Sequence, residues 1–280
     1  MVPLLLLTLM AQTPKPSASN PTASLAAARQ LYNQHRYAEA IAAAAEARRA
    51  AAIADAAAVV FARAHLERFR QSAQPQDLSE AREALTSVVD ARLSPREHME
   101  LVVGLGEALY FDNRLTAAAE FFEVALAHVD VLEPEAPELL FEWWSTALGQ
   151  QAELGPEAER RALYLRILAK AEDELRRNDR SAIASYWIAA AARGANELDR
   201  AWGAAMAGWV RAPLTGARGA KLRTDLDRFV MLVLIPERAR QLTGTGDAKT
   251  ATAKLVQEWE DLKSKYGAGF QGSRVPGSDE

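Results

Sequence analysis

Cysteine is absent from the 280-residue sequence. Its absence excludes disulfide bonds, thiolate zinc sites, a thiol nucleophile and a lipid anchor attached to an N-terminal cysteine. Aromatic residues make up only 7% of the chain, while apolar residues make up 49%, and many of these are alanine. Alanine favours helices and buries little area, whereas strands favour β-branched and aromatic residues. The composition therefore predicts many closely packed helices.

A strong excess of either charge is also missing. The 33 basic and 37 acidic residues give a formal net charge of −4, and no extended basic block occurs. Nucleic-acid binding is therefore not expected. Local arginine pairs such as Arg160-Arg161 and Arg176-Arg177 stand among glutamates and are interpreted as solvated, ion-paired helix faces.

Motifs for catalysis or for cofactor binding are missing too. The four histidines are dispersed, and Gly104-Leu105-Gly106 lacks the third glycine of a dinucleotide fingerprint. Ala248 stands before Lys249 where a phosphate loop needs glycine, so Asp247 is interpreted as the N-cap of a helix. We expect no catalytic residue, metal ion or cofactor and predict a protein that is not an enzyme. A hydrolase assembled from distant side chains is the alternative.

A short apolar run, Val2 to Ala11, follows the first methionine. It is too short to span a bilayer, which takes about 20 residues, but it has the length of a signal-peptide core. We therefore expect residues 1–11 to be a signal peptide, 12–21 to be a Pro/Ser/Thr-rich linker, and the protein to be periplasmic or secreted. No Lys or Arg precedes the run, so a leader on a cytoplasmic protein is the alternative.

From about Thr22 to Lys265 the pattern is almost continuously helical, and it contains internal repeats. Three segments superimpose without a gap. In each of them a small residue is followed at fixed spacings by further small and large residues. The matching positions are Ala28, Leu31, Tyr37, Ala40, Ala44 and Ala47 in the first segment, Gly106, Leu109, Leu115, Ala118, Phe122 and Ala125 in the second, and Ala189, Ala192, Leu198, Ala201, Ala205 and Gly208 in the third.

This pattern resembles the tetratricopeptide repeat (TPR), a helix–turn–helix unit of roughly 34 residues. Small residues at a helix crossing let the two helices approach closely, which gives the pattern a physical basis. Two weaker matches, at 61–88 and 137–168, lie between the three clear ones. The resemblance implies an all-α fold, a right-handed α-solenoid of about five TPR-like helix pairs over residues 22–212.

The chain after the repeats follows a different pattern. Leu222 to Ile235 is helical in spacing, and Pro236 is predicted to interrupt or kink that helix. A last helix is expected near 250–266. We interpret 213–266 as a helical cap that covers the final repeat, and 267–280, which is rich in Gly and Ser, as a disordered tail.

The tryptophans are interpreted mainly as packing residues. Trp202 and Trp209 are seven positions apart and therefore share one helix face. Trp143 and Trp144 are adjacent, so they point in different directions on a helix, and one of them is expected to be partly exposed. An exposed aromatic side chain is a suitable anchor for a peptide.

The family resemblance also implies a function. In TPR proteins the first helices of the repeats line a concave face, and the register assigns a set of side chains to it. They are Arg29, Tyr32, Arg63, Leu66, Glu107, Tyr110 and Arg193. Arg and Tyr are common interface anchors. We predict a non-catalytic scaffold, without a transmembrane span, that binds a protein or peptide partner. A self-associating subunit of an envelope or secretion assembly is the alternative.

Overall fold

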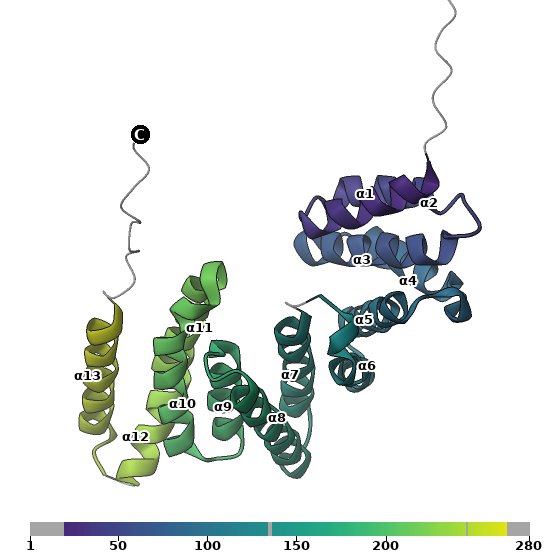
Figure 1. Cartoon of the computed structure of the whole chain (residues 1–280). Helices are drawn as coiled ribbons and strands as arrows, with labels where there is room; N and C mark the ends of the chain where they lie inside the picture. Colours follow the sequence, from purple (N-terminus) through teal and green to yellow (C-terminus); the bar gives the residue numbers. More distant parts are fainter. Residues whose placement is uncertain (1–19, 134–135, 245, 268–280) are drawn as a thin grey trace, which may run out of the picture. The chain divides into compact units, whose positions relative to one another are not determined.

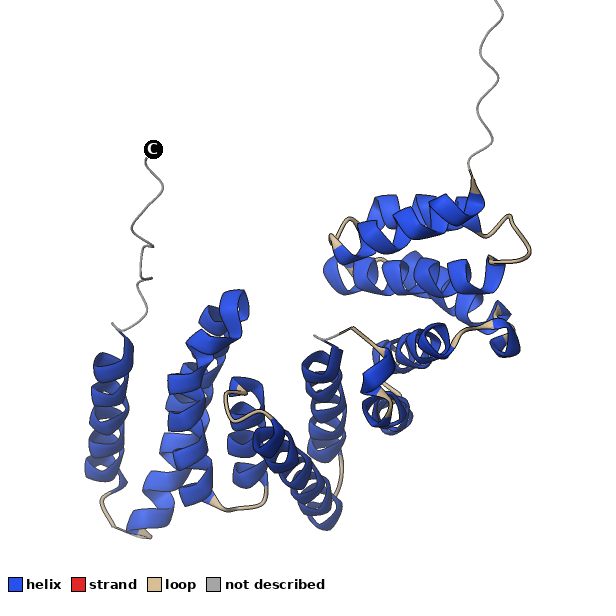
Figure 2. Ribbon diagram, viewed as in Figure 1, coloured by secondary structure: helices blue, strands red, loops and turns tan. Residues whose placement is uncertain are grey.

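The computed structural model describes residues 20–133, 136–244 and 246–267, and its secondary structure in these ranges is helical, without strands (Figure 2). The all-α prediction is therefore confirmed. None of the described helices is both long enough and apolar enough to cross a membrane. The predicted signal peptide, nearly all of the predicted linker and nearly all of the predicted tail lie outside the described residues.

The chain divides into two compact units, with the boundary between Gly104 and Leu105 inside α5 (Pro95–Phe111). The first unit contains α1 (Pro21–Asn33), α2 (Tyr37–Ala47), α3 (Ala54–Ser72), α4 (Pro75–Ser87) and the short η1 (Asp90–Arg92) (Figure 1). Helix α3 is central to this unit because α1, α2 and α4 all contact it. Its residues are consequently buried on nearly every side.

The second unit begins with the end of α5 and continues to α13 (Figure 1). It contains α6 (Leu115–Ala127), η2 (Val129–Val131), α7 (Ala136–Leu154), α8 (Glu157–Arg177), α9 (Ala182–Gly194), α10 (Leu198–Arg211), η3 (Ala212–Arg218), α11 (Gly219–Phe229), η4 (Val230–Leu234), α12 (Ile235–Thr243) and α13 (Ala248–Gly267). From α6 to α10 each helix packs against the next, and α9 also contacts α7 and α11.

Three helix pairs share one type of turn. His35, Asn113 and Asn196 follow the small position of each clear repeat match by seven residues, and their φ angles are +59°, +59° and +66°. The next residue in each turn donates its backbone N–H to a carbonyl five positions earlier, over 2.8–2.9 Å. This is the hydrogen bond of a Schellman motif, which ends a helix with a left-handed residue.

The small residues of these pairs lie where the helices cross. Ala28, Ala40, Ala118, Ala189 and Ala201 are all completely buried. A Cβ atom added to Gly106 would lie 2.8 Å from Cε1 of Phe122, closer than side chains pack. A larger residue at these positions would therefore push the paired helices apart.

The C-terminal helices agree with the two local predictions made for them. Pro236 occupies the first turn of α12, directly after the π-helical turn η4, so its missing N–H falls where the helical hydrogen-bond pattern is already interrupted. Asp247 accepts hydrogen bonds from the backbone N–H groups of Lys249 and Thr250, at 3.0 and 3.4 Å. It therefore caps α13, as predicted.

Candidate functional site

Three of the predicted partner-binding residues lie together in the first unit. Arg29 of α1 donates to Glu97 of α5, with 2.5 Å between Nη2 and Oε1. Arg63 of α3 places its guanidinium 5.0 Å from the centre of the Tyr32 ring. All three side chains are half-buried. A cation over an aromatic face beside an ion pair is a surface that can take up a peptide by small side-chain movements.

Leu66, the fourth residue predicted in this unit, is placed in the core. It exposes 1% of its surface, on the helix that α1, α2 and α4 cover. The repeat register assigned it to an accessible face, but register alone does not show how many neighbours a helix has. Leu66 therefore stabilises the unit and offers a partner no usable surface.

Tyr110 lies in an aromatic cluster of the second unit. Its ring meets that of Trp143 edge-to-face at 4.9 Å, and Gln150 of α7 donates to its hydroxyl over 2.8 Å. Trp143 is partly exposed while Trp144 is buried, which agrees with the expectation for this adjacent pair. Glu107, one turn earlier in α5, exposes only 3% of its surface. Of the two predicted α5 residues, Tyr110 is the one with accessible surface.

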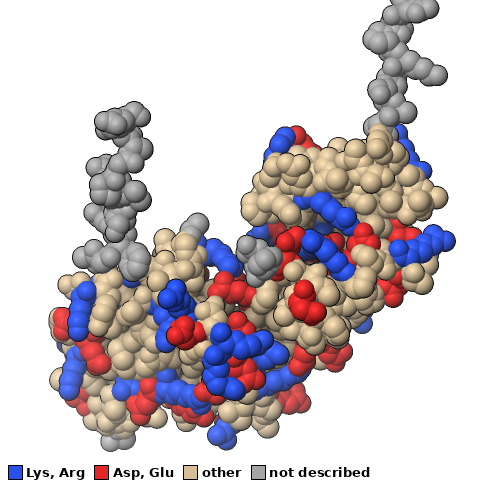
Figure 3. Space-filling view, viewed as in Figure 1, with Lys and Arg blue, Asp and Glu red and all other residues tan. Residues whose placement is uncertain are grey.

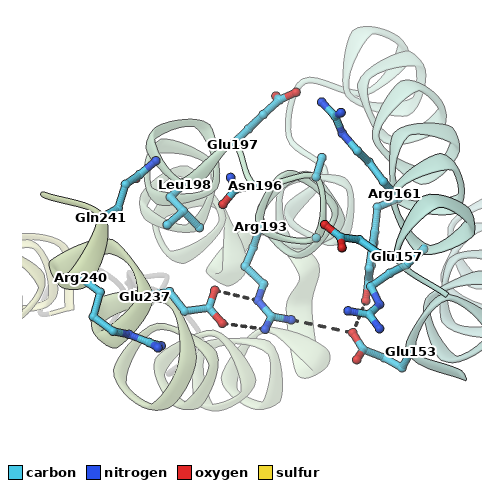
Figure 4. A pocket seen from close by; sticks show the side chains of 14 residues that line it. Glu153, Glu157, Arg161, Arg193, Asn196, Glu197, Leu198, Glu237, Arg240 and Gln241 are labelled. Atoms are coloured by element: carbon cyan, nitrogen blue, oxygen red, sulfur yellow. Dashed lines mark hydrogen bonds and ion pairs between the residues drawn. The ribbon is translucent and has the colours of Figure 1, made fainter. Parts of the chain in front are cut away.

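Arg193 lines a polar groove of about 810 Å³ at the ends of several helices in the second unit (Figure 4). Its guanidinium makes a two-pronged ion pair with Glu237 of α12, at 2.9 and 2.7 Å, and lies 3.8 Å from Glu153 of α7. The bidentate hydrogen bond with Glu237 is the main cause that raises the pKa of Arg193. Arg193 therefore joins α9 to α12 as well as lining the groove.

The other walls of the groove are also charged. Glu157, Arg160 and Arg161 line it from α8, Arg240 lines it from α12, and Glu197 lines it from the residue before α10; Glu157, Arg161, Glu197 and Arg240 are labelled in Figure 4. Positive and negative side chains are likewise interspersed on the face drawn in Figure 3. A mixed lining of this kind suits a polar peptide better than an apolar ligand.

Tyr164 of α8 also lines this groove. Its hydroxyl donates to Glu153 over 2.5 Å, and burial together with this carboxylate raises the pKa of Tyr164 far above its usual range. A Cβ atom added to Gly194 would lie 2.2 Å from the ring, so only glycine fits beside it. A phenol held in its neutral form with its proton directed at Glu153 is a structural group, not a base.

The structure thus places the predicted accessible residues in three locations. Arg29, Tyr32 and Arg63 share the first unit, while Tyr110 and Arg193 line different parts of the second. Sequence reasoning missed Trp143 as the partner of Tyr110, and it missed Glu237 as the partner of Arg193. Glu237 is 44 residues from Arg193, and no spacing rule links the two positions.

Within the described residues, no three His, Asp or Glu side chains gather as a metal site would require. Comparisons with known proteins add no assignment. No family model, no curated protein and no solved structure matches this chain.

Proposed function

We propose that this protein is a non-catalytic scaffold that binds a segment of another protein, and that its helix pairs form a right-handed α-solenoid of about five TPR-like units. The observation that carries the proposal is the shared turn of three helix pairs. His35, Asn113 and Asn196 have nearly equal positive φ angles, and each turn is closed by the same hydrogen bond. Many unrelated helices end with a left-handed residue, so the support comes from its position: in all three pairs it follows the small residue by seven positions.

The chemistry of the first helices supports a binding role. Arg29, Tyr32, Arg63, Tyr110 and Arg193 all come from the first helix of a helix pair and all keep accessible surface. Arg and Tyr side chains bind well at protein interfaces because they combine apolar area with directed hydrogen bonds. Their present contacts within the chain hold them in defined conformations, which lowers the entropy lost on binding.

A pull-down of the tagged full-length protein from a lysate of its source, read by mass spectrometry, tests this proposal. A candidate partner is then purified, and its affinity is measured for wild type and for Arg29→Gln, Tyr32→Ala and Tyr110→Ala. We expect at least one variant to weaken binding about tenfold or more, as an interface anchor would. Arg49→Gln, on an exposed residue just after α2, is the matched control and should bind as wild type does.

Circular dichroism and denaturation must show that each variant keeps its helices. If all three face variants bind as tightly as the control, the partner binds elsewhere and the assignment of the face is wrong. If no partner is captured and sedimentation instead shows a defined oligomer of the purified chain, the protein is a self-associating subunit and the scaffold proposal fails.

The proposed location is the periplasm or the exterior of the cell, on the basis of the apolar run that begins at Val2. Determining the N-terminus of the protein recovered from its source tests this. A chain that begins near Gln12 supports export, while a chain that retains Val2 contradicts it.

A further inference from the structure

The polar groove that Arg193 lines contains four arginines and four glutamates, so its formal charges cancel. Their ion pairs do not use the two kinds of group evenly, however. Glu237 and Glu153 both pair with Arg193, at 2.7 and 3.8 Å. Glu197 pairs with Arg200, which lies outside the lining, over 3.0 Å. Three of the four glutamates are therefore already engaged by a cation.

The other three arginines of the groove pair with no carboxylate among the described residues. Arg161 and Arg240 are both exposed. Nε of Arg240 donates to the backbone carbonyl of Pro236 in its own helix, at 3.1 Å. Arg160 donates to the backbone carbonyl of Gly155 over a long 3.4 Å. These guanidinium groups thus keep most of their donors for another partner.

The balance of unpaired groups in the groove is positive. Glu157 is the one glutamate of the lining that pairs with no cation in the described part of the chain. Three unpaired guanidinium groups therefore stand against one unpaired carboxylate, an excess of two positive charges. A concave surface with such an excess attracts a ligand that carries negative charge.

Two side-chain amides in the same groove indicate that this ligand is a peptide. Asn196 and Gln241 are exposed, and neither side chain makes a hydrogen bond within the described residues. Each amide offers a donor and an acceptor, which is what a peptide main chain needs. Figure 4 draws Arg193 between Arg161 of α8 and Arg240 of α12, so a ligand that contacts both of these arginines must be extended.

We propose that this groove binds an extended acidic segment of the partner, with Asp or Glu side chains at Arg161 and at Arg240. The inference rests on the proposed function and names the chemistry of the bound segment. A guanidinium group binds a carboxylate through two parallel hydrogen bonds, as Arg193 already binds Glu237. Because Arg161 and Arg240 make no ion pair within the described chain, binding would break none.

A library of random peptides displayed on phage and selected on the immobilised full-length protein tests this. We expect the selected peptides to be rich in Asp and Glu. The affinity of the strongest one is then measured by fluorescence anisotropy, beside an analogue in which Asn and Gln replace its Asp and Glu. The analogue should bind about tenfold or more weakly, and so should the acidic peptide to the double variant Arg161→Gln, Arg240→Gln.

The double variant Arg180→Gln, Arg228→Gln is the matched control. It removes the same charge from two exposed arginines that lie outside the groove and make no ion pair in the described chain. An equal loss of affinity in both double variants would show general charge attraction and overturn the proposal. Selected peptides that are not acidic, or an analogue that binds as tightly, also overturn it. Circular dichroism should show unchanged helicity, since both groove arginines are exposed.

The same measurements separate this inference from the proposed function. Peptides that lose affinity in Tyr32→Ala or Tyr110→Ala but keep it in Arg161→Gln, Arg240→Gln would support a scaffold that binds elsewhere. The groove proposal alone would then fail. If the wild-type protein selects no peptide at all, both proposals are contradicted.

Discussion

The Nδ1 atom of His65 lies 2.7 Å from Oδ1 of Asp77, and both side chains are buried in the first unit, with 6% and 1% of their surfaces exposed. Arg68 donates to the same carboxylate at 2.6 and 3.2 Å. Burial lowers the pKa of His65; the hydrogen bond and charge of Asp77 oppose this in part, and the charge of Arg68 adds to it. His65 is therefore a buried neutral histidine at neutral pH.

The pH dependence of stability follows from this environment. Because the pKa of His65 is lower in the folded chain than its unfolded value of about 6.5, the unfolded chain binds the proton more readily below that pH. The free energy of unfolding should therefore fall as the pH drops below about 6.5, by at most about 1.4 kcal/mol per pH unit from this group. Urea denaturation between pH 7.5 and pH 5 measures this decline.

Two variants distinguish the contribution of His65 to this pH dependence from the contributions of other titrating groups. His65→Gln, which is neutral at every pH, should flatten the decline, while His98→Gln at a half-exposed position should keep it. A decline of equal size in His65→Gln and wild type would show that other groups cause it.

Gly106 should tolerate alanine poorly despite lying in a helix. The added methyl group would meet the buried ring of Phe122 at 2.8 Å, and overpacking of this kind costs about 1–3 kcal/mol. Gly203 of α10 has no heavy atom within 4 Å of such a methyl group, so Gly203→Ala should instead stabilise the protein by up to about 1 kcal/mol. Chemical denaturation of both variants tests the contrast, and equal effects would show that Gly106 is not a crossing position.

At the turn residues with positive φ, alanine and glycine should have different effects on the free energy of unfolding. At Asn113, with φ at +59°, alanine should cost about 1 kcal/mol whereas glycine should be neutral or slightly stabilising. Ala73 already carries this strain at φ +53°, so Ala73→Gly should raise the free energy of unfolding by up to about 1 kcal/mol. Asn33→Ala, at an exposed position of α1, is the matched control with an effect below about 0.5 kcal/mol. A loss at Asn33 as large as at Asn113 would contradict the backbone explanation.

The sequence predicts those features that depend on a few neighbouring residues. The crossing alanines, the turn after Leu31 or Leu109 and the Asp247 cap are all local, so spacing alone identifies them. The burial of Leu66 depends instead on three helices packing around α3, which no local pattern encodes.

Arg193 shows that a contact between distant helices can change the role that sequence register predicts for a residue. Sequence register predicts a partner-binding arginine, yet its guanidinium already makes a bidentate pair with Glu237, and both side chains are about seven-tenths buried. Removing the Arg193 guanidinium leaves the Glu237 carboxylate partly desolvated and without this ion pair. Arg193→Met should therefore lower the free energy of unfolding by about 1–3 kcal/mol.

A double-mutant cycle with Glu237→Gln decides whether this loss belongs to the pair. We expect the two changes together to cost clearly less than the sum of the single changes, because the second removes a group that the first has already left unpaired. Arg200→Met, which breaks the exposed pairs with Glu172 and Glu197, is the matched control and should cost less than about 1 kcal/mol. If the effects of Arg193→Met and Glu237→Gln simply add, the pair does not join α9 to α12. The ion pair would then add no net stability, and the loss in Arg193→Met would come from other contacts of this side chain.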